Sequence, residues 1–296
     1  MALHARLLLI GLYASGCSPT AQAVTPAPTE ITLHDYHGYG AVDVEVAGQQ
    51  VPFFFDTGGG ITIITPALAA DLHRKPWGRL TGYRMRGDRL DLPKCDPFAL
   101  GFGSLQVVPS AVAVFDLGAF MPKDWTVLPG ILTLQSLDPH AITIDLAHRH
   151  LTVENDESLK GRIAKMTPLE VRFERSSGGL TLVAFLAAKT PSGRAIWLEF
   201  DSGSDSTLVL APHAAAMLGI DLEAPTVEKK IDKSGRVDRW IVPELEIQLA
   251  GLAPIKTRAV VEDLIFDGNF GRELIKNWVF TLDLKEGRAW ATPANR

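Results

Sequence analysis

The chain has 296 residues, of which 46% are hydrophobic and 21% charged, and its formal net charge at pH 7 is −5. A chain of this length and apolar content can bury a substantial core, either as two domains or as one large bilobal unit. Its acidic balance, with no basic stripe interleaved with aromatic residues, argues against nucleic acid as a partner.

The N-terminus has the pattern of an export signal. His4 and Arg6 precede an apolar stretch over residues 7–14 that is too short to cross a bilayer as a helix. Two processing routes are open, since Ala23 ends a small-x-small cleavage site and Cys17 ends a sequence that resembles a lipoprotein box. Lipidation of Cys17 would anchor the protein to a membrane, whereas cleavage after Ala23 would free it.

We therefore expect an exported protein of the bacterial periplasm. Residues 1–23 would be a signal peptide, or residues 1–16 a lipoprotein signal, and residues 24–30 a short tether. Either route leaves Cys95 without a thiol partner in the mature chain, so stability has to come from packing and not from a disulfide. No His-Glu-x-x-His, paired Cys-x-x-Cys or phosphate-binding glycine loop occurs, and we expect neither a metal nor a cofactor.

One internal repeat organises the chain. In the first half, apolar and polar residues alternate over 41–46, a turn follows, and an apolar run over 51–55 leads into Asp56. In the second half, a run over 180–186, a turn at 190–193 and a run over 195–200 lead into Asp201. These patterns predict a β-hairpin before each acid. After each acid the sequence predicts a second strand and a short helix that begins at a proline, at Pro66 and at Pro212.

The ends of the two halves match as well. Gly130 and Gly268 are 138 residues apart, and the same offset relates Thr143 to Thr281 within two similar apolar runs. The polar segment 154–161 separates the halves. We therefore expect a mainly β fold with an N-terminal lobe over 31–155 and a C-terminal lobe over 165–293.

Each repeat contains an acid where an acid is costly. Asp56-Thr57-Gly58 and Asp201-Ser202-Gly203 both follow an apolar run. A carboxylate beside so much apolar side chain is unfavourable unless it is paired or used in chemistry. Two such sites in matching surroundings predict that the acids meet. Adjacent carboxyls that share one proton can activate water.

These duplicated triplets, the strands after them and the apolar-apolar-Gly segment late in each half resemble the aspartic peptidases. The resemblance covers roughly residues 31–292 and is stronger to the retroviral-type branch, because the halves carry little elaboration. It implies two pseudo-symmetric acid-protease-like β-barrel lobes with short helices. It also implies catalytic roles for Asp56 and Asp201. By the same resemblance, the hydroxyls of Thr57 and Ser202 would bond to the opposite lobe.

The glycines of the triplets would leave room for water and substrate, at Gly58 and Gly203. The resemblance further implies an ion pair between Asp205 and Arg272 in the second lobe. The first lobe departs from the family pattern at Gly59, which replaces a small side chain.

A second departure is Thr133, which stands where the second lobe has Gly271. A substrate-covering hairpin is implied over 80–90, with Tyr83 as its contact residue, or over 229–240. A plain surface hairpin is the alternative at both places. Arg84, Arg86 and Arg89 of the first hairpin could favour acidic substrate side chains, but a solvated edge strand explains them better.

The resulting prediction is an aspartic endopeptidase that acts on polypeptides. Both acids lie in one chain, so a monomer would suffice. Two alternatives are weaker: a catalytically silent lipoprotein of the same fold that binds peptides or serves as a scaffold, and an unrelated two-domain β-sandwich adhesin or sugar-binding lipoprotein.

Overall fold

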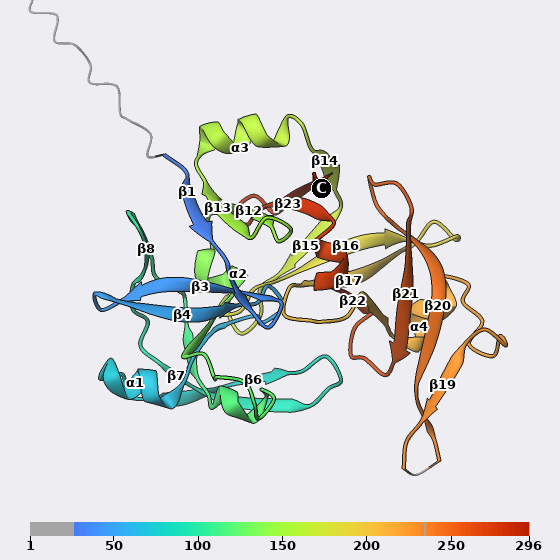
Figure 1. Ribbon diagram of the computed structural model, residues 1–296, viewed down its shortest axis with the longest axis horizontal. Helices are drawn as coiled ribbons and strands as arrows, with labels where there is room; N and C mark the ends of the chain where they lie inside the picture. The colour runs from blue at the N-terminus through green and yellow to red at the C-terminus, as the bar shows by residue number, and fades with distance from the viewer. Residues whose placement is uncertain (1–26, 234, 296) are drawn as a thin grey trace, which may run out of the picture.

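The computed structural model describes residues 27–233 and 235–295 and shows a mainly β fold (Figure 1). Its strands form three sheets in the described part of the chain, of ten, eight and six strands. The predicted signal segments, 1–23 or 1–16, and Cys17 with them, lie outside the described residues. In the described ranges, no helix combines the length and the apolar character that crossing a membrane requires.

The ten-stranded sheet belongs to the first half of the chain. Its strands are β2 (His34–Tyr36), β3 (Tyr39–Val46), β4 (Gln49–Phe55), β5 (Thr62–Ile64), β6 (Trp77–Tyr83), β7 (Arg89–Cys95), β8 (Leu100–Phe102), β9 (Leu105–Val107), β10 (Val112–Val114) and β11 (Gly130–Leu132). The predicted first hairpin is β3–β4, which turns at Ala47 and Gly48 with both φ angles positive, at 50° and 80°. A two-residue turn of this kind matches the twist of the strands that it joins.

The eight-stranded sheet belongs to the second half. Its strands are β15 (Val171–Glu174), β16 (Val183–Lys189), β17 (Ala195–Asp201), β18 (Leu208–Leu210), β19 (Glu228–Ile231), β20 (Val237–Leu249), β21 (Ile255–Glu262) and β22 (Gly268–Gly271). The predicted second hairpin is β16–β17. In both of these sheets, the strand before the acid pairs in parallel with a strand late in the same half: β4 with β11, and β17 with β22.

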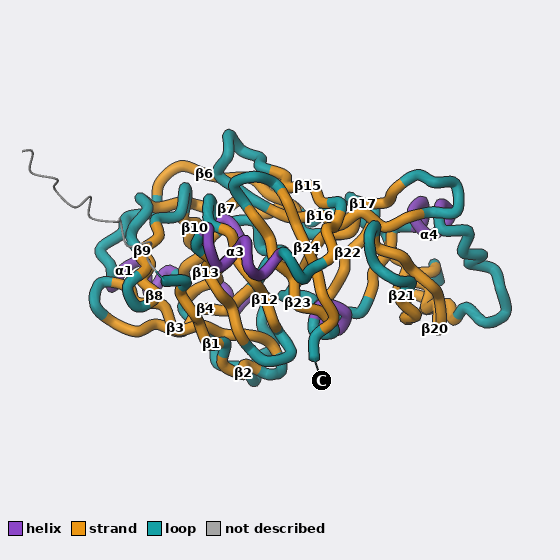
Figure 2. Tube along the Cα trace, turned by 90° about the horizontal axis from the view of Figure 1, so that it is seen from above, coloured by secondary structure: helices purple, strands orange, loops and turns teal. Residues whose placement is uncertain are grey.

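The six-stranded sheet takes strands from both halves. They are β1 (Thr29–Thr32), β12 (Ala141–Asp145), β13 (His150–Glu154), β14 (Thr167–Leu169), β23 (Trp278–Asp283) and β24 (Arg288–Pro293), in the order β1-β13-β12-β23-β24-β14. Figure 1 shows this sheet at the upper centre of the molecule, below α3, with β3 and β4 of the first half beneath it and β20 and β21 of the second half to its right, and Figure 2 views β12, β13, β23 and β24 from above, near the centre.

This sheet changes one boundary predicted from the sequence and joins the two predicted lobes. Residues 29 and 30 were expected in the tether, but they belong to β1 and pair with β13, where Thr29 and Ile31 offer the branched side chains that strands favour. The ranges 31–155 and 165–293 also share a sheet, because β12 of the first pairs with β23 of the second.

Five short helices connect the strands of the described residues: α1 (Pro66–Asp71), α2 (Leu134–Leu137), α3 (Asp156–Ile163), α4 (Pro212–Met217) and α5 (Arg272–Ile275), with a 3₁₀ turn at Leu117–Ala119. The helices predicted to begin at Pro66 and Pro212 are α1 and α4. The polar segment 154–161 is largely α3, whose first turn carries two acids and whose last turn carries two basic residues, as the helix dipole favours. Cys95 in β7 is buried and free.

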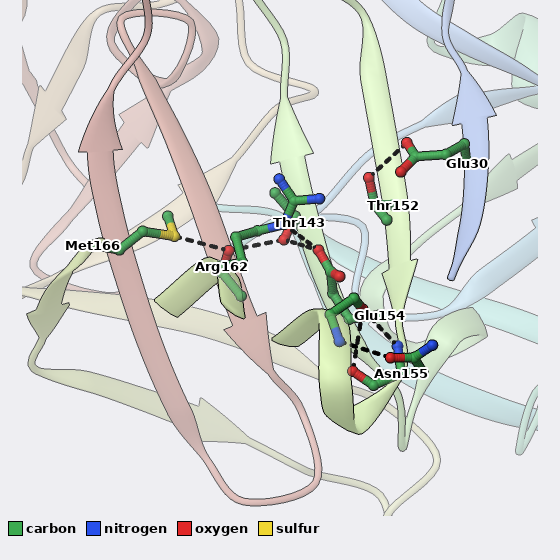
Figure 3. A network of polar contacts seen from close by, with 9 residues as sticks. Glu30, Thr143, Thr152, Glu154, Asn155, Arg162 and Met166 are labelled. Atoms are coloured by element: carbon green, nitrogen blue, oxygen red, sulfur yellow. Dashed lines mark hydrogen bonds and ion pairs between the residues drawn. The ribbon is translucent and has the colours of Figure 1, made fainter. Parts of the chain in front are cut away.

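A buried carboxylate links α3 to the six-stranded sheet (Figure 3). Glu154 is 7% exposed, accepts a hydrogen bond from the Thr143 hydroxyl at 2.6 Å and pairs with Arg162 of α3. The hydroxyls of Thr143 and Thr281 lie 2.8 Å apart where β12 meets β23. Two residues that match in the internal repeat therefore contact each other at the centre of this sheet.

Candidate active site

The two acids of the repeated triplets lie at the ends of β4 and β17. Asp56 directly follows β4, and its N–H donates to the carbonyl of Leu132 in β11 at 3.0 Å. Asp201 is the last residue of β17 and lies opposite Gly271 of β22. Both side chains are partly buried. Each acid is thus held at the end of its strand by pairing with a neighbouring strand, β11 for Asp56 and β22 for Asp201.

The structure brings the two acids into contact. A side-chain hydrogen bond joins Asp56 to Asp201. The triplet glycines make this approach possible, since a Cβ on Gly58 would lie 2.6 Å from Cγ of Asp201, and a Cβ on Gly203 would lie 2.6 Å from Cγ of Asp56. A real Cβ never comes that near, so only glycine fits at either position.

Four hydrogen bonds cross between the halves beneath the acids. The Thr57 hydroxyl accepts from the Ser202 N–H at 2.9 Å and donates to the Phe200 carbonyl at 2.7 Å. The Ser202 hydroxyl accepts from the Thr57 N–H at 3.1 Å and donates to the Phe55 carbonyl at 3.2 Å. Thr57 and Ser202 are 0% and 2% exposed. The reciprocal bonding expected for these two residues is therefore present, and it fixes the acids relative to each other.

The two carboxyls have unequal surroundings. Oδ1 of Asp201 accepts from the N–H groups of Gly203 and Ser204 at 2.8 and 3.1 Å, and its Oδ2 accepts from Nδ2 of Asn269 at 2.7 Å. Asp56 accepts from the N–H of Gly58 at 2.9 Å. Asp201 thus has more donors to stabilise a negative charge.

This difference decides where the shared proton lies. Burial and then the charge of Asp201 raise the pKa of Asp56 well above its ordinary value. Burial also raises the pKa of Asp201, but its hydrogen bonds from Asn269 and from Asp56 act in the opposite direction. The larger number of donors at Asp201 favours the negative charge there and the shared proton on Asp56. A pair so coupled gains and loses its protons as a unit.

Sequence reasoning missed Glu199 and Asn269. Asn269 is 0% exposed, lies opposite Glu199 across β17 and β22, and directs Nδ2 to Glu199 at 3.4 Å as well as to Asp201. The period of two in β17 places Glu199 on the same face as Asp201, and that spacing is the signal that could have found it.

The predicted ion pair between Asp205 and Arg272 is not formed in the described part of the chain. The Arg272 guanidinium lies 4.1 Å from the centroid of the Tyr39 ring, donates to the Gly38 carbonyl and pairs with Glu273 at 3.6 Å. Asp205 is exposed. The arginine gains a ring contact and a charge-assisted hydrogen bond, whereas Asp205 keeps its carboxylate in solvent, where an ion pair adds little.

The two departures in the first half compensate each other. A Cβ on Gly59 would lie 2.9 Å from Cγ2 of Thr133, so the Thr133 methyl group occupies the space that a side chain at 59 would need. In the second half, a Cβ at Gly271 would lie 2.2 Å from the Ser206 carbonyl oxygen, so that position requires glycine.

The hairpin expected over 80–90 is formed by β6 and β7, and its turn contains Gly87 with φ +88°. Tyr83 is 60% exposed, and in residues 27–233 and 235–295 it makes no hydrogen bond or ring contact with either acid. The second hairpin, β19–β20, also turns at its expected place, near Gly235.

The tip of the β6–β7 hairpin contacts the second half of the chain. The Ile265 N–H donates to the Met85 carbonyl at 3.0 Å, and the Arg86 guanidinium binds both carboxylate oxygens of Glu262, which is 6% exposed. The expectation that Arg86 is simply solvated was wrong, because its partner is a buried acid 176 positions away that sequence periodicity does not reveal.

No three His, Cys, Asp or Glu side chains of the described residues are placed to hold a metal ion. A scan against models of known protein families finds no match to this chain, and a search of the curated proteins finds none. The site therefore has to be interpreted from its own geometry.

Proposed function

We propose that the protein is an aspartic endopeptidase that hydrolyses peptide bonds in polypeptides with water activated by Asp56 and Asp201. The observation that carries this proposal is the proton-sharing contact of the two acids above the reciprocal bonds of Thr57 and Ser202. A rigid pair with one proton supplies a general base and a general acid in the same site.

We also propose that the two halves form acid-protease-like β-barrel lobes related by a local two-fold axis. Three observations support this arrangement. Thr57 and Ser202 bond to each other reciprocally, Thr143 lies opposite Thr281, and each acid contacts the other triplet's glycine. A two-fold axis between the halves requires such self-complementary contacts.

The proposed reaction follows from which of the two acids carries the proton at each step. The Asp201 carboxylate takes a proton from a water molecule while that water's oxygen bonds to the scissile carbonyl carbon. Asp56 gives its proton to the carbonyl oxygen, so that a neutral tetrahedral diol forms. When the C–N bond breaks, Asp201 delivers its proton to the leaving nitrogen and Asp56 recovers one from a diol hydroxyl. Both carboxyls return to their starting states.

The rest of the proposal follows from the sequence. Both acids belong to one chain, so a monomer is sufficient for activity. The N-terminal pattern supports export to the periplasm, either free or anchored by a lipid on Cys17. Neither a metal nor a cofactor has a role in the proposed reaction.

Cleavage of an unfolded protein at mildly acidic pH tests the proposal. We expect the wild type to cleave, a statine-type inhibitor to block it, and Asp56→Asn or Asp201→Asn to lower kcat/KM by at least about 10³-fold. Asp71→Asn is the matched control, because Asp71 is an exposed acid at the end of α1. Cleavage that survives in either dyad variant would refute the proposal, and peptide binding without turnover would identify the silent binding protein instead.

A further inference from the structure

Glu199 is a third carboxyl group beside the two acids of the site. It precedes Asp201 by two residues on β17, and buried and partly exposed residues alternate along this strand. Ile196, Leu198 and Phe200 point into the core, so the opposite face carries both Glu199 and Asp201. Glu199 therefore belongs to the surface on which the site opens.

The neighbours of Glu199 leave its charge uncompensated. Across the sheet it lies opposite Phe185 of β16 and Asn269 of β22. Its other electrostatic neighbours are acids, namely Asp201, Asp56 and Glu174. Within the described ranges, no Lys, Arg or His side chain forms an ion pair with Glu199.

A cation is available on the same sheet but is directed elsewhere. Arg172 of β15 pairs with Phe185 in register, yet its guanidinium lies over the Trp197 ring, 3.7 Å from the centroid. Burial, followed by the charges of Asp201 and Asp56, raises the pKa of Glu199 well above its ordinary value. The environment of Glu199 thus lacks a positive charge that would stabilise the carboxylate.

The equivalent position in the first half is apolar. Phe54 precedes Asp56 by two residues and is 6% exposed, and its ring packs 6.1 Å from Tyr36 and 5.4 Å from Tyr39 between centroids. One side of the acid pair is therefore apolar and aromatic, and the other carries a carboxyl group. A polypeptide bound across the pair would meet a different chemistry on each side of the bond that is cut.

We propose that Glu199 is a specificity-determining residue that selects a Lys or Arg side chain of the substrate on the Glu199 side of the scissile bond. This inference rests on the proposed peptidase function. Two residues of strand separate the α-carbons of Glu199 and Asp201, a distance of about 6.7 Å. The long, flexible side chains of Lys and Arg can cover that distance from a backbone held at Asp201. Their charge supplies the counter-ion that the site lacks.

The preference depends on pH in a defined direction. Glu199 binds a cation as a carboxylate, so the preference for a basic side chain grows as pH rises through its raised pKa and declines below it. Asp56, Asp201 and Glu174 face Glu199 as acids and Asn269 as a neutral donor. None of these groups replaces the missing cation.

Matched peptides test the inference in cleavage. Two peptides differ only on the Glu199 side of the cut bond, with Lys in one and uncharged norleucine in the other. At the highest pH at which the wild type still cleaves, we expect its kcat/KM to favour Lys by about tenfold. Glu199→Gln should abolish the preference, and the control Glu174→Gln should retain it, because Glu174 is an exposed acid of the same sheet. Equal cleavage of both peptides by the wild type, or a preference that survives in Glu199→Gln, would overturn the inference.

A binding measurement separates this inference from the proposed function. In an Asp56→Asn background, where Asn has the shape of the protonated acid, fluorescence anisotropy should show the Lys peptide binding about tenfold more tightly than the norleucine peptide. Adding Glu199→Gln should remove the difference. Equal binding in the Asp56→Asn background would overturn the role of Glu199. Selective binding together with no cleavage by the wild type would refute the peptidase and support the role of Glu199 in recognition.

Discussion

The hydroxyl of Thr57 offers the sharpest test of how the two halves are held together. Thr57→Val removes this hydroxyl while keeping nearly the same shape, so the change in packing is small. It leaves the N–H of Ser202 and the carbonyl of Phe200 without the partner that bonds them at 2.9 and 2.7 Å. All three residues are at most 2% exposed, so water does not replace the lost bonds.

The size of the effect follows from these two groups. Each buried polar group left without a partner costs about 1–3 kcal/mol, so Thr57→Val should lower the free energy of unfolding by about 2–6 kcal/mol. Urea unfolding followed by tryptophan fluorescence and by far-UV circular dichroism measures this, provided that the two transitions coincide.

The matched control is Thr81→Val. Thr81 is exposed and its hydroxyl donates to Asp91 at 2.7 Å, so its loss should change the free energy of unfolding by no more than about 0.5 kcal/mol. If Thr57→Val costs no more than Thr81→Val, the reciprocal bonds do not stabilise the contact between the halves.

Two further predictions concern pH and the β6–β7 hairpin. Because folding raises the pKa of Asp56, the folded chain binds more protons than the unfolded chain between about pH 4 and the raised pKa. The free energy of unfolding therefore falls as pH rises through this range. Tm should fall less in Asp56→Asn than in the wild type between pH 4 and pH 7, and equal falls would contradict the shift. Arg86→Ala leaves the carboxylate of Glu262 without its partner and should speed hydrogen exchange of the Ile265 amide, while Arg84→Ala, in the same turn, should not. Unchanged exchange in Arg86→Ala would show that the ion pair does not hold the tip in place.

Local pattern was enough to predict the elements that carry the acids. Apolar runs before Asp56 and Asp201, and a proline at the start of the following helix, are local signals that packing reinforces, and β4, β17, α1 and α4 follow them. The contact of the acids could also be predicted, because two costly charges in matching places favour one shared solution.

Long-range partners could not be predicted in the same way. The pairing of β12 with β23 places Thr143 opposite Thr281, 138 residues away, and the periodicity of either strand does not indicate which strand it pairs with. The choice of Arg272 between Asp205 and Tyr39 depends on where a flexible side chain finds a ring and a carbonyl. Glu199 was missed for a related reason. The sequence indicates that it shares a face of its strand with Asp201, but not that the Asn269 amide links it to the acid pair.

The contact between Thr143 and Thr281 has a consequence for how mutations can accumulate in the two halves of this chain. In a symmetric dimer of identical subunits, one mutation alters both sides of the interface together. Here the two matching residues are encoded at separate positions of one chain, so one can be substituted while the other stays unchanged. Phe54 and Glu199, each two residues before its acid, differ in this way, since one is apolar and the other acidic.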